Sequence, residues 1–107
     1  MHDLQIDPQE VKQKIDRGEE FVLLDVRERW EHEICRIDGS VLVPMNELPA
    51  RAASLEEAAE VVVYCHSGIR SLNAAAWLRA QGIESARSMA GGIDRWSREI
   101  DSAVPRY

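Results

Sequence analysis

The residues best suited to chemistry occupy one short segment: Cys65, His66, Ser67, Gly68, Ile69, Arg70 and Ser71. A nucleophilic thiol opens this segment, and a permanent cation follows five residues later. Gly68 permits backbone angles that other residues resist, so the N–H groups of the segment can converge on one point and bind an anion. The segment therefore predicts a cysteine that binds or attacks an anionic group.

The surroundings expected for Cys65 favour its ionised form. A helix is predicted to begin at about Arg70 or Ser71, and the first N–H groups of a helix carry a positive potential equivalent to about half a charge. Arg70 adds a permanent charge and a planar donor fork. Helix N-termini and nearby arginines favour the thiolate, which is the nucleophilic form of cysteine. We therefore predict that Cys65 is an activated nucleophile rather than an inert buried thiol.

The other histidines and cysteines have weaker functional signals. His66 is interpreted as a loop residue without a proton-transfer role, because an ionised thiol hardly needs a general base. The alternatives are that it tunes the thiolate or touches the substrate. Cys35 is interpreted as a buried structural thiol, with a resolving role opposite Cys65 as the alternative. The pairs His32–Cys35 and Cys65–His66 match no zinc-ligand spacing, so no metal site is predicted.

Alternating strands and helices must position the Cys65 segment. Apolar runs predict strands at residues 21–26, 39–44, 61–65 and, more weakly, 86–90. Helical patterns are predicted at residues 5–18, 27–34, 46–60, 71–82 and 91–100. This alternation implies parallel βαβ units, which form a central parallel sheet with helices on both faces. Ligands bind beyond the carboxyl ends of such strands, which is where Cys65 falls.

Local signals mark the ends of two predicted helices. Asp7 is expected to cap the helix at residues 5–18, with Pro8 in its first turn and Glu10 completing a capping box. Gly18 and Gly82 are expected to end helices at the position that favours left-handed backbone angles.

The aromatic residues are predicted to be structural. The three tryptophans are expected to lie in the core or to cover the sheet: Trp30, Trp77 and Trp96. Tyr64 is expected to pack under the Cys65 loop. The glycine pair at 91–92 is interpreted as a tight turn before the last helix, because it is too short for a dinucleotide-binding fingerprint.

Size and charge exclude several classes of protein. The 107 residues suffice for one domain, predicted over residues 1–107. A net charge of −6 argues against nucleic acid and anionic membranes as partners. Residues 61–107 nevertheless carry a net charge of +2, which suits a small anionic ligand near Cys65. No signal peptide or membrane-spanning run is evident, so a cytoplasmic location is expected.

Four segments of the chain resemble motifs of the rhodanese family, specifically its small single-domain members. "LLDVRERWEHE" resembles the family's Asp-Val-Arg-x-x-x-Glu motif, and "RIDGSVLVPMNEL" its Ile-Pro-Gly-Ala-x-x-Ile-Pro motif. "VVVYCHSGIRS" resembles the active-site strand and loop, and "MAGGIDRW" the Gly-Gly-x-x-x-Trp motif. Cys35 and Asp38 stand where the family has a glycine and a proline, which alters the stiffness of that turn but leaves the chemistry of the Cys65 loop unchanged.

The resemblance implies an α/β fold of the rhodanese-like type, a three-layer sandwich around a five-stranded parallel sheet. It also implies a sulfurtransferase in which thiosulfate or a persulfide gives its outer sulfur to Cys65. The Cys65 persulfide would then pass this sulfur to cyanide, a thiol or a carrier protein, with no further cofactor. Arg70 would hold the small anionic donor, and the amides of residues 66–71 would stabilise the persulfide.

The resemblance assigns a supporting role to a second group of residues. Asp25, Arg27 and Glu31 match family positions that we interpret as structural. We expect them to form an ion-pair network that braces the Cys65 loop.

Two other functions remain open from the sequence. Related Cys-loop phosphatases and arsenate reductases place five residues between cysteine and arginine, whereas this chain has four. The smaller ring suits a single sulfur atom better than a tetrahedral oxyanion. The other alternative is a sulfur-relay module that serves a protein partner in cofactor synthesis or tRNA thiolation.

Overall fold

A sheet of five parallel strands forms the centre of the protein, in the order β1-β5-β4-β2-β3. The computed structural model describes residues 4–107. The strands are β1 (Gln5–Ile6), β2 (Val22–Asp25), β3 (Val41–Leu42), β4 (Val61–Tyr64) and β5 (Arg87–Met89). The predicted five-stranded parallel sheet is therefore confirmed, with β4 as its middle strand.

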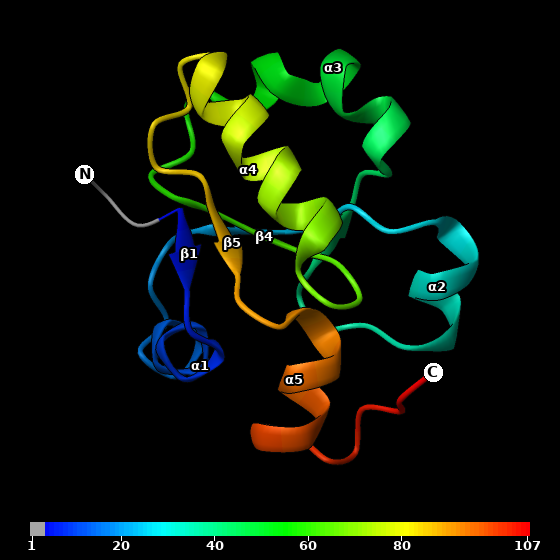
Figure 1. Cartoon of the computed structure of the whole chain (residues 1–107). Coiled ribbons are helices and arrows are strands. Elements are labelled where there is room, and N and C mark those ends of the chain that lie inside the picture. The colour runs from blue at the N-terminus through cyan, green and yellow to red at the C-terminus, as the bar shows by residue number, and fades with distance from the viewer. Residues whose placement is uncertain (1–3) are drawn as a thin grey trace.

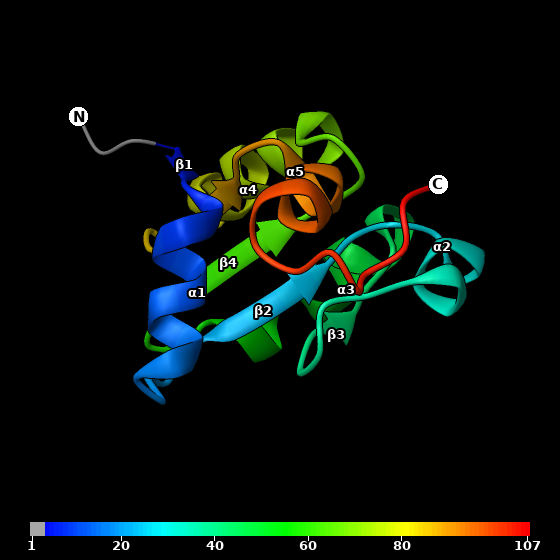
Figure 2. The same cartoon turned by 90° about the horizontal axis from the view of Figure 1, so that it is seen from below.

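Helices cover both faces of this sheet. They are α1 (Pro8–Asp16), α2 (Arg29–Ile34), α3 (Leu48–Arg51), α4 (Ile69–Ala80) and α5 (Gly92–Glu99). Two 3-10 turns flank α3: η1 (Met45–Glu47) and η2 (Ala52–Leu55). Figure 1 shows α3 and α4 on one side of the sheet and α1 and α5 on the other, with α2 beyond one end of the central strands. The view from below in Figure 2 places α1 and α5 in front of β2 and β4.

The middle strand β4 contributes to two separate cores, because successive side chains of a strand point to opposite faces. Val61, Val63 and Cys65 belong to the cluster under α3 and α4. Val62 and Tyr64 belong to the cluster under α1 and α5. Every residue of β4 is fully buried, as expected for a parallel strand covered on both faces. This alternation directs the Cys65 side chain towards α4.

The start of the chain differs from the sequence prediction. Gln5–Ile6 forms strand β1 beside β5, whereas we predicted a helix from residue 5. A residue before proline is pushed towards extended angles, so the helix begins only at Pro8. Asp7 occupies the N-cap position, but its side chain makes no capping hydrogen bond. The predicted capping box with Glu10 is therefore wrong.

Other predicted boundaries hold to different degrees. Gly18 and Gly82 follow the ends of α1 and α4 with φ values of +66° and +96°, as predicted. The strand predicted at 39–44 is only two residues long, and the helical region at 46–60 divides into η1, α3 and η2. Within residues 4–107, no helix is both long enough and apolar enough to cross a membrane.

Candidate active site

Cys65 lies directly after β4, in the loop that leads into α4. The helix begins at Ile69, slightly earlier than predicted, with Gly68 as its N-cap. Gly68 adopts a φ of +105°, a left-handed conformation that other residues rarely adopt. A Cβ atom at this position would also stand 3.2 Å from the backbone nitrogen of Gly91. Glycine therefore allows the tight turn that places the start of α4 beside the thiol.

The sulfur atom of Cys65 is surrounded by hydrogen-bond donors. The backbone N–H groups of Gly68 and Ser71 donate to Sγ, with N···S distances of 3.2 and 3.3 Å. The Cys65 thiol in turn donates to the hydroxyl oxygen of Ser71 at 3.4 Å, and once the thiol ionises this hydroxyl can donate to the sulfur instead. Cys65 is only 1% exposed. Two amides that converge on one buried sulfur stabilise negative charge on it, and the adjacent hydroxyl can join them when the thiol is ionised.

A second serine supports this arrangement from β5. The hydroxyl oxygens of Ser71 and Ser88 are 2.7 Å apart, and both residues are fully buried. Ser88 therefore restricts the rotation of the hydroxyl that faces Cys65. We did not single out Ser88 from the sequence, although a polar residue inside a predicted buried strand was a usable signal.

The start of α5 holds the Cys65 loop from behind. The backbone N–H of Ile93 donates to the carbonyl of Cys65 at 2.9 Å, and that of Asp94 donates to the carbonyl of His66 at 3.0 Å. Gly92 makes this approach possible, because a Cβ atom there would stand 2.5 Å from the Cys65 carbonyl oxygen. The glycine pair, which we interpreted only as a turn, also fixes the position of the loop.

Arg70 is held by a carboxylate of α2. Its Nη1 and Nη2 donate to the two oxygens of Glu31 at 2.7 and 2.8 Å. Burial raises the pKa of Glu31, but hydrogen bonds from Arg70 and Tyr107 outweigh it and lower this pKa to about 2. The ion pair in turn raises the pKa of Arg70. The guanidinium therefore stays charged and lies against α2, with its side chain 37% exposed.

A fully buried ion pair lies behind this contact. Arg27 donates through Nε and Nη2 to the two carboxylate oxygens of Asp25 at 2.9 and 2.8 Å, and both side chains are 0% exposed. Nη2 also donates to the backbone carbonyl of Cys35 at 2.6 Å. Burial raises the pKa of Asp25, but hydrogen bonds from Arg27 and His32 outweigh it and lower this pKa.

Tyr107 joins the two ion pairs. Its hydroxyl accepts a hydrogen bond from Arg27 Nη1 at 2.9 Å and donates one to Glu31 Oε2 at 2.6 Å. Burial and the bond to Glu31 raise the pKa of Tyr107 to about 12, so the hydroxyl keeps its proton. The ring also meets His66 edge to face, with centroids 4.3 Å apart. No local pattern in the sequence distinguishes Tyr107, because all of these partners are distant along the chain.

The predicted site residues thus lie together in the loop after β4, but they differ in exposure. Ser67 and Ile69 are exposed on the outer side of the loop. Tyr64 does not pack under the loop as we predicted. Its hydroxyl instead contacts Asp25 and Ser40 on the side of the sheet that α5 covers.

The remaining predictions for this region have mixed outcomes. Cys35 is buried, as predicted, and belongs to the cluster under α1 and α5, whereas Cys65 belongs to the opposite cluster. Trp30 is 57% exposed, so its predicted core position is wrong, whereas Trp96 is buried at 4%. In the described part of the chain, no group of three or more His, Cys, Asp or Glu side chains could hold a metal ion.

Comparison with known proteins places this geometry in a family. A family model of the rhodanese-like domain matches residues 7–99. The chain belongs to this family. The "Sulfurtransferase" of Allochromatium vinosum is 33% identical, over 88% of this chain and 88% of its own length. The human single-domain sulfurtransferase TSTD1 has a similar structure, with a TM-score of 0.79, 26% identity and coverage of 92% and 98% of the two chains.

This rhodanese-like chain also resembles part of a larger protein. The "Adenylyltransferase and sulfurtransferase MOCS3-1" of Zea mays is 39% identical over 92% of this chain. The match spans only 22% of the maize protein. The similarity therefore concerns one region of that protein and not its whole activity.

The pKa of Glu31 leads to a prediction for acid stability. Because this pKa falls from 4.5 to about 2 on folding, ionised Glu31 stabilises the fold fully above pH 4.5, and this stabilisation is lost as the pH falls towards 2. Glu31→Gln is expected to lower the free energy of unfolding by about 1–3 kcal/mol at neutral pH. Urea titrations should show this deficit shrinking through the acid range. A deficit independent of pH would contradict the assignment, and Glu33→Gln is the exposed control on the same helix.

Proposed function

We propose that this chain is a sulfurtransferase that carries sulfane sulfur on Cys65. The observation that carries the proposal is the convergence of two amides and one hydroxyl on the Cys65 sulfur. Such a site stabilises a thiolate, and in our proposal the N–H groups of the same loop also stabilise the negative charge on the outer sulfur of a Cys65 persulfide. Membership in the rhodanese-like family supports a role in sulfur transfer.

The first step loads sulfur from an anionic donor such as thiosulfate. The Cys65 thiolate attacks the outer sulfur of thiosulfate and forms a new S–S bond. The S–S bond of thiosulfate breaks, and sulfite leaves with the electron pair. Cys65 then carries a persulfide with one negative charge, and no external oxidant or reductant is needed.

The second step unloads the sulfur and restores the enzyme. Cyanide or a thiolate attacks the outer sulfur of the persulfide, and the bond to the Cys65 sulfur breaks. With cyanide the product is thiocyanate, and Cys65 returns as a thiolate. In our proposal the exposed part of the Arg70 guanidinium attracts the donor, while Glu31 keeps this cation beside the loop.

The experiment measures sulfur on the intact protein. After incubation with thiosulfate, the wild type is expected to gain one sulfur atom by mass spectrometry and to release thiocyanate when cyanide is added. Cys65→Ser is expected to gain no sulfur and to lose thiocyanate production. Cys35→Ser is the matched control and should load like the wild type. No mass gain, with phosphatase or arsenate reductase activity instead, would overturn the proposal.

A second candidate is a sulfur relay to a protein partner. The maize relative favours it, because its name joins a sulfurtransferase to an adenylyltransferase in one protein. In this role a persulfide donor protein loads Cys65 and a carrier protein accepts the sulfur, in a reducing compartment such as the cytoplasm. A persulfide that forms readily but reaches cyanide slowly favours the relay. Rapid turnover with thiosulfate and cyanide favours the small-molecule reaction.

A further inference from the structure

The segment after α5 returns across the molecule to the Cys65 loop. In Figure 1 it runs from the end of α5 and finishes beside α2. Val104 and Tyr107 pack against the core under α1 and α5, which anchors the segment. The family match ends at residue 99, so this segment lies outside the part of the chain that the family model describes.

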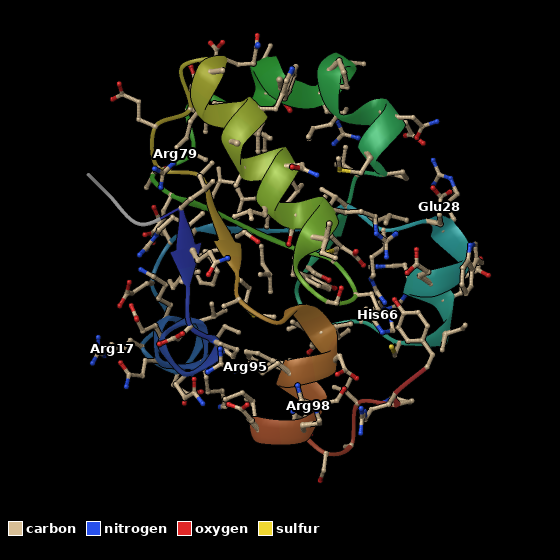
Figure 3. All side chains as sticks on the ribbon, viewed as in Figure 1. Arg17, Glu28, His66, Arg79, Arg95 and Arg98 are labelled. Atoms are coloured by element: carbon tan, nitrogen blue, oxygen red, sulfur yellow. The ribbon has the colours of Figure 1, made fainter. Side chains whose placement is uncertain are left out.

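Tyr107 contacts groups at both ends of the Cys65 loop. Its ring meets the ring of His66, the residue that follows the nucleophile, at 4.3 Å. Its hydroxyl bonds to Glu31, the carboxylate that holds Arg70. Figure 3 shows His66 on the side of the loop that faces α2 and the end of the segment. The tyrosine thus lies against the loop on this side and connects its two ends.

The protein covers the nucleophile almost completely. Cys65 is 1% exposed, so a reagent must pass the side chains that surround the loop to reach its sulfur. Ile69, in the same segment, is 71% exposed. On the α2 side, Tyr107 and its neighbour Trp30 form an aromatic border, with ring centroids 6.2 Å apart.

We propose that Tyr107 is a specificity-determining residue, the wall that limits the size of donors and acceptors able to reach Cys65. This inference rests on the proposed function for its biological meaning. A ring that packs against His66 and Trp30 excludes bulky groups from the α2 side while leaving small anions such as thiosulfate and cyanide unaffected. The ring is the barrier, and these ring contacts keep it in place when the hydroxyl is removed.

The test compares small and bulky reagents at the same cysteine. Cys65 is alkylated with iodoacetamide and, separately, with a fluorescein maleimide, and peptide mass spectrometry counts modification at Cys65 alone. Tyr107→Ala is expected to raise the ratio of bulky to small reagent rates by about tenfold, whereas Tyr107→Phe keeps the ring and changes this ratio by less than about twofold. The ratio of sulfur transfer to glutathione over cyanide should rise in the same variant.

The outcomes separate this inference from the proposed function. If Cys65 carries no sulfur, the transfer arm fails but the alkylation arm still decides the role of Tyr107. Rapid alkylation of the buried Cys35 would reveal that Tyr107→Ala is unfolded, and Tyr107→Leu, which retains an apolar anchor, then replaces it. An unchanged ratio in the folded variant overturns the inference. An equal rise in Tyr107→Phe also overturns it, because the ring would then not be the barrier.

Discussion

Arg27→Ala is expected to lower the free energy of unfolding by about 3–5 kcal/mol, because it leaves a buried carboxylate without its main partner. Asp25 is 0% exposed and receives two hydrogen bonds from the guanidinium of Arg27. The variant also frees the carbonyl of Cys35 and removes a donor from Tyr107. Urea or thermal unfolding measures the loss directly.

Two controls distinguish the effect of breaking a buried ion pair from the effect of removing any charged side chain. Lys12→Ala breaks the exposed pair with Asp16, where both side chains are about half exposed, and is expected to change stability by less than about 1 kcal/mol. In a double-mutant cycle, Asp25→Ala with Arg27→Ala is expected to cost far less than the sum of the two single variants. Additive single effects would contradict a directly coupled pair.

The activity of the Arg27→Ala protein is expected to survive better than its stability. The hydrogen bonds of Arg27 go to Asp25, Cys35 and Tyr107 and not to the residues that surround the Cys65 sulfur. Sulfur loading per folded molecule should therefore fall by much less than the folded fraction falls. The opposite result, a stable protein with lost loading, would place Arg27 in the reaction itself.

The sequence predicted the centre of the site because its signals are local. The apolar run of β4 ends at Cys65, and glycine, arginine and the start of a helix follow within five residues. These neighbours along the chain are enough to predict the loop, although α5 holds it in place. The buried face of α5 was also predictable, since Ile93 and Trp96 recur at helical spacing and both are buried.

The parts that the sequence did not predict depend on distant contacts or on very short elements. Ser88 contacts Ser71, which lies 17 residues away along the chain, and Tyr107 contacts Glu31, which lies 76 residues away. β1 has two residues, which are too few to show a periodic pattern. The predicted helix cap, Asp7, follows it directly, so the sequence favoured a helix there. Trp30 lies on a six-residue helix, which is too short to define a buried face from its sequence.

Gly92→Ala is expected to lower the rate of sulfur loading by about a hundredfold, because it displaces the loop that carries the nucleophile. Gly92 has a φ of +61°, and a Cβ atom there would stand 2.5 Å from the Cys65 carbonyl oxygen and 2.6 Å from the His66 carbonyl carbon. These are backbone atoms, which cannot rotate away as a side chain does. The start of α5 must therefore separate from the loop and lose the hydrogen bonds that Ile93 and Asp94 donate to it.

Gly18→Ala isolates the effect of this contact from the effect of backbone strain. Gly18 has a similar φ of +66°, but a Cβ atom there meets nothing within 4 Å. Gly18→Ala should therefore lose about 1 kcal/mol of stability to the strain of an alanine in the left-handed conformation, and it should load sulfur at the wild-type rate. Loading rates are compared by intact mass at conditions where both variants are folded. Equal loading by the two variants would show that α5 does not position Cys65. A loss of loading confined to Gly92→Ala would show that contact with α5 positions the loop.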